Sequence, residues 1–505
     1  MFKQNFPRRS VFQIIATGLL AFSVFACRTT IPDAPVAVDT EVTVTEAIAT
    51  EIEPTQPVPT ATSVPSATIA DESLPTPLPS IGDPYAPELG NTGIDVTHYT
   101  LELAFDPASS RPDAFEGSVL IEAMATQPLD EIWLDFVGFE ISELLVNDAA
   151  ADFERRDDKL VIGPDVPLQA GESFRIFVTY AGSPEIRQSP YVPFVDHLGL
   201  FYSEPDKLFV LAEPDGARFW FPCNDHPPDK ASFNFLIAVP EGYTAAANGE
   251  LTSERQLEDG NLLSVWEHDF PMAPYLATVA IGHYERIDQV SPNGFDMRHY
   301  VYAEHRANFE AQLDTIGEAM DWLTGLLGFY PFETFGYVSI PSQGASLETQ
   351  TLVMLDTNMV NPDVIVHEMT HMWFGDWVSL DSWGEMWRNE GFATYFQWYY
   401  PYRGDPEGFE AFMELRTQDI LSQTNLEPLN DLSKPNLFGY ESYIKGAVAV
   451  HALRQAMGDE AFFEGLRMYL AQYGGGTASD ADFKAVMEAA AGISLDGFFA
   501  EWIGE

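Results

Sequence analysis

The sequence predicts a multidomain α+β protein, in which an N-terminal β-sandwich-like domain is followed by a mainly helical domain. Two features of the pattern predict this order. Between about residues 90 and 285, apolar and polar side chains alternate with the period of two that is typical of half-buried strands. After about residue 290, apolar side chains recur at helical spacing instead. We therefore expect a β domain over residues 89–287 and a mainly helical domain over residues 288–505.

The first 26 residues have the pattern of a signal peptide. Lys3, Arg8 and Arg9 precede an apolar run over residues 11–26, which is short for a membrane span of about 20 apolar residues. The run ends in Val-Phe-Ala-Cys at Cys27, which resembles a bacterial lipobox and implies a lipid anchor on that cysteine. Ordinary cleavage near the same point would give a secreted protein instead. In both cases we expect an extracytoplasmic protein, either a cell-surface lipoprotein held at the membrane or a secreted protein.

Residues 27–88 have the composition of a disordered stalk. They are rich in Thr, Pro, Val, Ala and Ser, and neither the helical nor the strand period persists in them. Pro-rich segments of this kind form extended, semi-rigid spacers. We expect this segment to separate the folded domains from the N-terminal anchor.

The charge and the cysteine count exclude several classes of function. The chain has 25 Lys and Arg against 77 Asp and Glu, and its formal net charge is −52. No basic excess exists to neutralise phosphates, so we expect no nucleic-acid partner. With only Cys27 and Cys223, the chain has too few thiols for zinc knuckles, iron–sulfur sites or a disulfide scaffold. Any metal site must use His and carboxylates, and we expect Cys223 to be a structural thiol.

The strands of the β domain are predicted from alternation and turns. Every second residue from 99 to 105 is a large apolar one, which predicts a half-buried strand. Apolar residues at 119–121, and at 134 and 136 on either side of Asp135, predict further strands, and turn sequences such as Glu-Asp-Gly at 258–260 separate the runs.

The second domain contains helices with two short strands near its start. An apolar repeat over residues 309–320 has helical spacing, whereas residues 337–340 and 351–355 have strand character. A single apolar stripe over residues 462–473 predicts a helix that packs into the core.

The strongest chemical signal is the sequence His367-Glu368-Met369-Thr370-His371. On a helix, positions i and i+4 lie on one face, so both imidazoles can present a ring nitrogen to one Zn²⁺. Glu368 would lie beside the metal, where its carboxylate can accept a proton from water. The alternative is a helix whose two histidines only pack, and a third ligand would decide between them.

That third ligand is expected nineteen positions after His371. Glu390 lies in an Asn-Glu-Gly-Phe-Ala-Thr sequence on a segment that can form a second helix crossing the first. Two imidazoles and one carboxylate leave the fourth position of a tetrahedral zinc ion open, as a catalytic site requires. The sequence therefore predicts one Zn²⁺ ion bound by His367, His371 and Glu390.

Taken together, these motifs resemble those of the zinc aminopeptidases of the aminopeptidase N family, within the gluzincins. The resemblance covers about residues 90–505. Family members usually continue into further C-terminal domains, so the resemblance implies a short form. Besides the zinc ligands, the segments that carry the resemblance are Trp387–Ala393, Glu213–Arg218, Phe221–Asp225 and Tyr443–Ala447.

The resemblance implies a thermolysin-like fold for the mainly helical zinc-peptidase domain. By the same resemblance, His367, His371 and Glu390 bind zinc and Glu368 is the general base. Tyr443 would donate a hydrogen bond to the oxyanion of the tetrahedral intermediate. A neutral phenol suits this task, because it stabilises charge that develops only in the transition state.

The resemblance also implies an anionic site for the free α-ammonium group of a substrate. Glu348 corresponds to the carboxylate of the family's Gly-x-Met-Glu-Asn motif, and Glu213 corresponds to a second acidic group in the preceding domain. The motif departs from the family pattern, because Leu347 stands in place of Met and Thr349 in place of Asn. Two carboxylates that hold one ammonium group remain a sound charge arrangement.

The function predicted from the sequence is that of a zinc-dependent aminopeptidase, which hydrolyses N-terminal residues from peptides with a free N-terminus. Two alternatives stay open within the hydrolases, namely a thermolysin-like endopeptidase and an epoxide hydrolase of the same family. A third alternative is a non-catalytic surface binding protein. The presence of Glu368 together with three ligands argues against this last one, since a binding module needs no base.

Overall fold

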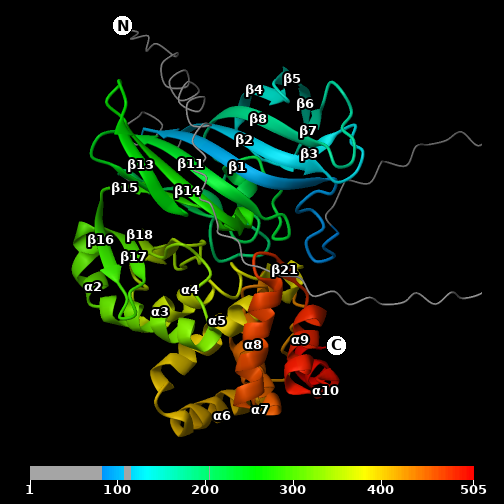
Figure 1. Cartoon of the computed structure of the whole chain (residues 1–505), viewed down its shortest axis with the longest axis vertical. Coiled ribbons are helices and arrows are strands. Elements are labelled where there is room, and N and C mark those ends of the chain that lie inside the picture. Colours follow the sequence, from blue (N-terminus) through cyan, green and yellow to red (C-terminus); the bar gives the residue numbers. More distant parts are fainter. Residues whose placement is uncertain (1–81, 107–114, 204, 505) are drawn as a thin grey trace, which may run out of the picture. The chain divides into compact units, whose positions relative to one another are not determined.

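The computed structural model describes residues 82–106, 115–203 and 205–504. The predicted signal peptide over residues 1–26, Cys27 and most of the predicted stalk lie outside the described residues. Within the described ranges, no helix combines the length and the apolar character needed to cross a membrane. The β-rich part precedes the mainly helical part, as the sequence predicts (Figure 1).

An eight-stranded sheet forms the body of the N-terminal domain. Strand β1 (Ile94–Phe105) lies inside it, parallel to β11 (Ala231–Val239) and antiparallel to β2 (Phe115–Ala125). The predicted alternation is confirmed, because Tyr99 and Leu101 are fully buried on one face of β1. The sheet order is β13-β14-β11-β1-β2-β8-β4-β5, and the remaining strands are β4 (Glu140–Val146), β5 (Ala149–Ala150), β8 (Ser173–Gly182), β13 (Glu250–Gln256) and β14 (Leu262–Met272).

Two smaller sheets complete this domain, with the strand orders β12-β15-β10-β9 and β3-β7-β6. The hairpin of β9 and β10 positions the site, because the chain leaves β10 and reaches Glu213 two residues later. The strands are β3 (Ile132–Asp135), β6 (Asp152–Arg156), β7 (Lys159–Gly163), β9 (Gly199–Ser203), β10 (Lys207–Leu211), β12 (Thr244–Ala247) and β15 (Val279–Gly282).

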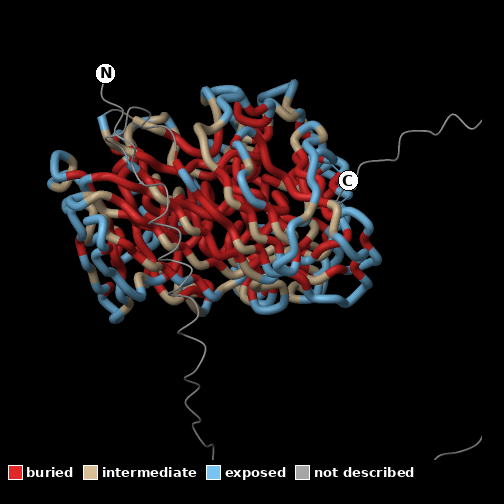
Figure 2. The backbone as a smooth tube through the Cα atoms, turned by 90° about the horizontal axis from the view of Figure 1, so that it is seen from above, coloured by how far each residue is buried: buried red, intermediate tan, exposed pale blue. Residues whose placement is uncertain are grey.

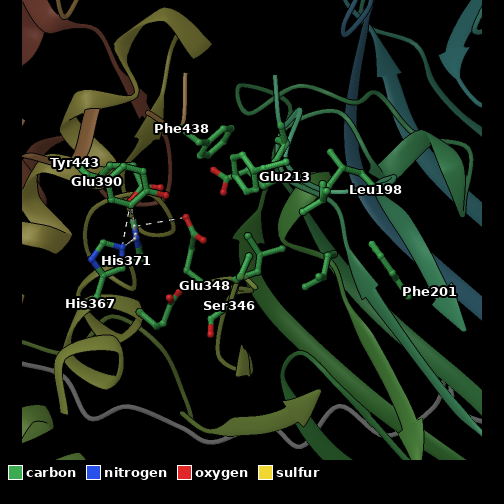
Figure 3. A pocket seen from close by; sticks show the side chains of 17 residues that line it. Leu198, Phe201, Glu213, Ser346, Glu348, His367, His371, Glu390, Phe438 and Tyr443 are labelled. Atoms are coloured by element: carbon green, nitrogen blue, oxygen red, sulfur yellow. Dashed lines mark hydrogen bonds and ion pairs between the residues drawn. The ribbon is translucent and has the colours of Figure 1, made fainter. Parts of the chain in front are cut away.

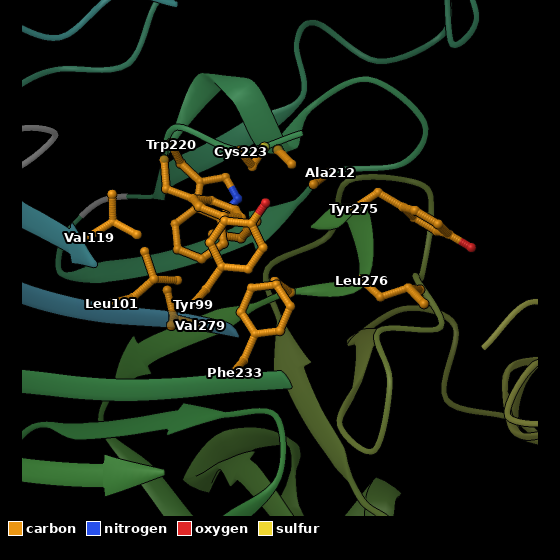
Figure 4. Packing of buried hydrophobic residues seen from close by; sticks show 14 of the residues in the cluster. Tyr99, Leu101, Val119, Ala212, Trp220, Cys223, Phe233, Tyr275, Leu276 and Val279 are labelled. Carbon is orange, nitrogen blue, oxygen red and sulfur yellow. The ribbon is translucent and has the colours of Figure 1, made fainter. Parts of the chain in front are cut away.

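The core of the β domain is rich in aromatic side chains. Tyr99 stacks on Phe233 with ring centroids 4.8 Å apart and meets the edge of the Phe221 ring at 5.6 Å (Figure 4). Cys223 is fully buried within the same apolar cluster, and burial raises the pKa of its thiol well above the ordinary value. The thiol therefore stays protonated, which agrees with the structural role expected for it.

A four-stranded sheet begins the second domain, in the order β16-β17-β18-β19. Its strands are β16 (Tyr284–Val290), β17 (Asp296–Tyr302), β18 (Tyr337–Ile340) and β19 (Val353–Asp356). The domain boundary predicted between residues 287 and 288 falls inside β16. Because β16 pairs with β17 along its whole length, the sheet of the second domain begins at Tyr284.

Helices make up most of the second domain. The apolar repeat over residues 309–320 is divided between two helices, whereas the stripe over residues 462–473 lies on one, with Leu466 fully buried. The helices are α2 (Arg306–Glu310), α3 (Leu313–Leu327), α4 (Pro362–Thr370), α5 (Trp387–Tyr399), α6 (Pro406–Ser422), α7 (Gly446–Met457), α8 (Asp459–Tyr473), α9 (Asp480–Ala491) and α10 (Asp496–Phe498), and a parallel pair of short strands, β20 (Ser379–Leu380) and β21 (Thr477–Ala478), lies among them.

One apolar cluster extends through both domains. Residues Val338, Leu347, Met354, Trp383 and Leu437 of the second domain are buried in the same cluster as the core of the β domain. Figure 2 shows the buried segments running together through the middle of the described chain. An apolar interface of this kind holds two domains in a fixed orientation. Side chains from both domains can therefore build one site.

The end of the predicted stalk is part of the folded structure, which corrects the boundary expected at residue 88. Asp83 is buried, and it accepts hydrogen bonds from His226 Nε2 at 2.9 Å, Ser382 Oγ at 2.7 Å and the Trp383 N–H at 3.1 Å. Burial alone would raise the pKa of Asp83, but these donors, with the Tyr85 N–H, lower it to about 2. The carboxylate thus joins the two domains.

Candidate active site

Helix α4 carries the two histidines of the predicted metal site. Its first turn is fixed by Asn361, whose side-chain oxygen accepts hydrogen bonds from the backbone N–H groups of Asp363 and Val364, and by Pro362 at the first helical position. His367 and His371 then lie one turn apart at the C-terminal end of the helix, and both are buried. Helix α5 packs against α4 and brings Glu390 to the same point (Figure 3).

The three predicted donors have the spacing of a tetrahedral zinc site. His367 Nε2 lies 3.1 Å from Glu390 Oε2 and 3.3 Å from His371 Nε2, and His371 Nε2 lies 3.6 Å from Glu390 Oε2. Bonds of about 2.0–2.1 Å in a tetrahedron separate the ligand atoms by about 3.3–3.4 Å. The donor set therefore fits one zinc ion.

Two contacts that the sequence reasoning missed orient the imidazoles. His367 Nδ1 lies 3.1 Å from Gln397 Oε1, and His371 Nδ1 lies 3.1 Å from the carbonyl oxygen of Phe374. Both oxygens can only accept, so each Nδ1–H donates and each Nε2 keeps its lone pair for a metal. Gln397 follows Glu390 by seven residues, two turns along the same helix face, and this spacing was the signal that could have revealed it.

Glu368 lines the same pocket and is buried. One of its carboxylate oxygens lies within 4.8 Å of ligand-type atoms of Glu348 and His371. Burial raises the pKa of the Glu368 carboxyl well above its ordinary value, and the nearby charge of Glu348 adds to this effect. A carboxylate with a raised pKa beside a metal site is suited to take up a proton.

Glu213 and Glu348 come from different domains and meet in the pocket. Each is almost fully buried, and each has one carboxylate oxygen without a hydrogen-bond partner. Oxygen atoms of Glu213, Glu348 and Glu390 all lie within 4.8 Å of one another. Burial, and then the charge of Glu348, raise the pKa of Glu213 well above its ordinary value. A cation between the carboxylates would let both be ionised, whereas without one a carboxyl here takes up a proton.

Tyr443 lies in the pocket wall, on a short π-helix over residues 441–445. Its ring stacks on His367 with centroids 5.7 Å apart, and burial raises the pKa of its phenol well above the ordinary value. The hydroxyl is therefore a neutral hydrogen-bond donor. Close packing sets its position, because a Cβ on Gly391 of α5 would meet the backbone of Gly446 at 2.8 Å.

Tyr440, the second tyrosine near the motif, is excluded from this role by its position. Its ring is exposed, and its hydroxyl donates to Asp419 Oδ2 at 2.9 Å, away from the pocket.

These residues share one pocket, which encloses about 580 Å³ of empty space including its opening to solvent. One end holds the metal donors and Tyr443, and the two carboxylates Glu213 and Glu348 lie further along (Figure 3). Beyond them the walls become apolar. The apolar lining residues are Val192, Phe194, Val195, Leu198, Phe201, Leu211, Ala345, Leu347 and Phe438.

Several known aminopeptidases are similar to this chain in sequence. Glutamyl aminopeptidase of Homo sapiens is 26% identical over 317 residues, which cover 57% of this chain and 33% of that protein. Puromycin-sensitive aminopeptidase of Caenorhabditis elegans is 26% identical over 315 residues, with 57% and 33% covered. The chain thus spans about a third of the length of these relatives in those alignments, and about half (47%) of the length of the Mus musculus glutamyl aminopeptidase.

A solved structure matches nearly end to end. The M1 zinc metallopeptidase from Deinococcus radiodurans has a TM-score of 0.77 and 29% identity, and the match covers 84% of this chain and 97% of that one. A mutant of the Deinococcus radiodurans enzyme, bound to a Tyr-Ser-Ala substrate, matches with a TM-score of 0.76 and 28% identity over 84% and 98%. These matches confirm the predicted fold class, a mainly β domain followed by a helical zinc-peptidase domain, and zinc as the metal of the family.

The family models agree with both domains. The Peptidase M1 N-terminal domain matches residues 96–276, and the Peptidase family M1 domain matches residues 332–502. Together the two segments make up more than half of the chain and contain all seven predicted site residues. The resemblance inferred from the motifs is confirmed, and the chain belongs to peptidase family M1.

Proposed function

We propose that this protein is a zinc aminopeptidase that removes N-terminal residues from peptides. The observation that carries the proposal is the pair of buried carboxylates, Glu213 and Glu348, each with one oxygen that accepts no hydrogen bond, in the same pocket as the metal donors. A metal site alone would suit any hydrolase of this class. A buried anionic site next to it suits the free α-ammonium group of a peptide, which supplies the missing positive charge.

Each site residue has a chemical task in this proposal. His367, His371 and Glu390 hold the zinc ion, which when bound acts as a Lewis acid and lowers the pKa of water. Glu368 removes a proton from the attacking water and delivers it to the leaving amine. Tyr443 donates its O–H to the oxygen of the tetrahedral intermediate.

The two carboxylates also argue for an exopeptidase over a thermolysin-like endopeptidase. An internal peptide segment that ran through the pocket would offer neutral amides to Glu213 and Glu348 and would leave their charges buried without a partner. Every cleavage at an internal peptide bond would therefore carry this unfavourable burial of charge. Peptide substrates are further supported by the related Deinococcus radiodurans enzyme, a mutant of which binds a Tyr-Ser-Ala substrate.

Hydrolysis of leucyl-coumarin amide by the purified folded part, with and without a chelator, tests the proposal. We expect hydrolysis that stops with the chelator and returns with zinc, and much slower hydrolysis of the N-acetylated analogue. Cleavage of an internally quenched peptide with a blocked N-terminus would favour the endopeptidase, and turnover of an epoxide alone would favour the epoxide hydrolase. Zinc binding without any turnover would favour the binding protein.

We also propose that the enzyme is extracytoplasmic and held at the membrane through Cys27, or secreted if that residue is not lipidated. The lipobox-like sequence before Cys27 and the stalk composition of the following residues support this. Expression of the full chain and of Cys27→Ser in a bacterium, followed by membrane fractionation and mass spectrometry, tests it. Equal release of both proteins into the soluble fraction would contradict the anchor.

A further inference from the structure

We propose that the apolar end of the pocket binds the side chain of the substrate's N-terminal residue, and that the enzyme is selective for large apolar N-terminal residues of the Leu, Met and Phe kind. The apolar end is defined here by Val192, Val195, Leu198, Phe201 and Leu211. The inference rests on the proposed aminopeptidase function and names the substrate class that this site accepts.

The first argument is position. In a substrate, the α-carbon carries both the ammonium group and the side chain, and the scissile carbonyl is its direct neighbour. With the carbonyl at the metal donors and the ammonium group between Glu213 and Glu348, the side chain must extend along the remaining direction of the pocket. Leu211 precedes Glu213 by two residues at the end of β10, and both side chains line the pocket. The apolar end therefore adjoins the ammonium site directly (Figure 3).

The second argument is chemistry. The apolar end has no charged or amide side chain, and no Lys or Arg lines any part of the described pocket. An N-terminal Glu or Asp would bury its carboxylate beside Glu213 and Glu348 without a cation to pair with. A Lys or Arg side chain would reach past the two carboxylates into an apolar space. Leu or Phe would instead exchange water for apolar contacts, which is favourable.

The third argument is rigidity. The Phe201 ring stacks against two other rings, with centroids 4.0 Å from His197 and 5.1 Å from Phe209. Gly199 has a φ of +95°, and a Cβ there would meet Phe219 Cβ at 2.8 Å, so the start of β9 between Leu198 and Phe201 is tightly packed. These walls are preformed, so binding of a side chain does not carry the loss of conformational entropy that ordering a flexible pocket would cost.

The opening of the pocket is also lined by apolar side chains. Phe194 of the β domain is 61% exposed, and Phe438 of the helical domain is half-buried, and both line the pocket. Exposed aromatic rings at an opening give apolar contact to a long side chain as it enters. A bulky N-terminal residue would therefore contact both domains.

Comparison of kcat/KM for coumarin amides of Leu, Phe, Ala, Glu and Arg on the folded part, residues 82–505, tests the inference. We expect Leu and Phe to exceed Ala by at least about tenfold, the range for added methylenes in an apolar pocket, and to exceed Glu and Arg by more. Hydrolysis with a preference for Ala, Glu or Arg would overturn the inference and leave the aminopeptidase function standing. No hydrolysis of any of the five would overturn both.

Two variants locate the selectivity. Leu198→Lys puts a cation into the apolar end, and we expect the Leu-to-Glu ratio of kcat/KM to fall at least about tenfold. The control Leu415→Lys changes an exposed residue of α6, and we expect it to leave this ratio unchanged. Because this ratio does not depend on the amount of active enzyme, partial misfolding does not disturb it. Phe194→Ala, at an exposed position, is expected to lower the Phe-to-Ala ratio several-fold. Unchanged ratios in both pocket variants would overturn the assignment.

Discussion

Replacement of Glu348 by Gln removes one of the two charges that are proposed to hold the substrate ammonium group. The side chain keeps its size, so the pocket walls stay in place. The Glu348 side chain is 3% exposed, and its Oε1 atom lies 3.5 Å from His371 Nδ1. This Oε1 atom has no hydrogen-bond partner. A hydrogen bond to a charged group contributes about 1.5–3 kcal/mol. At 1.36 kcal/mol per tenfold, kcat/KM should fall about 10- to 150-fold.

The assay compares leucyl-coumarin amide with its N-acetylated analogue in Glu348→Gln, Glu213→Gln and the double variant, with exposed Glu143→Gln as the matched control. We expect the loss only on the substrate with a free ammonium group. Because both carboxylates contact the same ammonium group, the two losses should not add independently. An equal loss on both substrates would refute the reasoning, since it would locate the damage at the metal site. Unchanged activity on the free substrate would refute it as well.

Three further perturbations follow from the site and the core. Glu368→Gln should retain zinc, measured by elemental analysis, and lower kcat by about 10²- to 10⁴-fold; unchanged turnover would contradict its role as base. Gln397→Leu should weaken zinc binding by about 10- to 100-fold in a chelator competition, with kcat little changed at saturating zinc; unchanged affinity would contradict its role in orienting His367. Burial and then the charge of Asp135 raise the pKa of Asp225 from the ordinary 3.8 to about 8, so its contribution to stability is present at low pH and is lost as the pH rises towards 8. Urea unfolding at pH 5 and pH 8 should therefore show a smaller loss of stability in Asp225→Asn than in the wild type, and parallel losses would contradict the assignment.

The metal centre could be predicted from the sequence because its geometry is local. The i, i+4 spacing of His367 and His371 fixes their common face on α4, and Glu390 lies on a following segment that can form a second helix crossing the first. The meeting of Glu213 with Glu348 depends instead on the packing of two domains. It was expected only from the resemblance, and the structure brings the two side chains together.

The departures around Glu348 are explained by the local structure. Leu347 pairs with Met354 through two backbone hydrogen bonds of 2.9 Å, and the Thr349 hydroxyl donates to the carbonyl oxygen of Leu352. Neither contact depends on the Met or the Asn of the family motif. The segment therefore still presents Glu348 to the pocket.

Two features could not be predicted because distant partners decide them. Residues 82–88 continue the composition of the stalk, yet Asp83 is buried by donors that lie far along the chain. The apolar end of the pocket combines the segment around Leu198 and Phe201 with Leu211. No periodicity in one segment indicates that these residues face a common space.

The central claim is that one zinc ion lies between His367, His371 and Glu390. A crystal of the folded part, measured on both sides of the zinc absorption edge, tests it most directly. The account predicts one strong anomalous peak at bonding distance, about 2.0–2.2 Å, from both Nε2 atoms and the Glu390 carboxylate. A zinc-loaded crystal with no peak there, or with its only peak at another set of side chains, would contradict it.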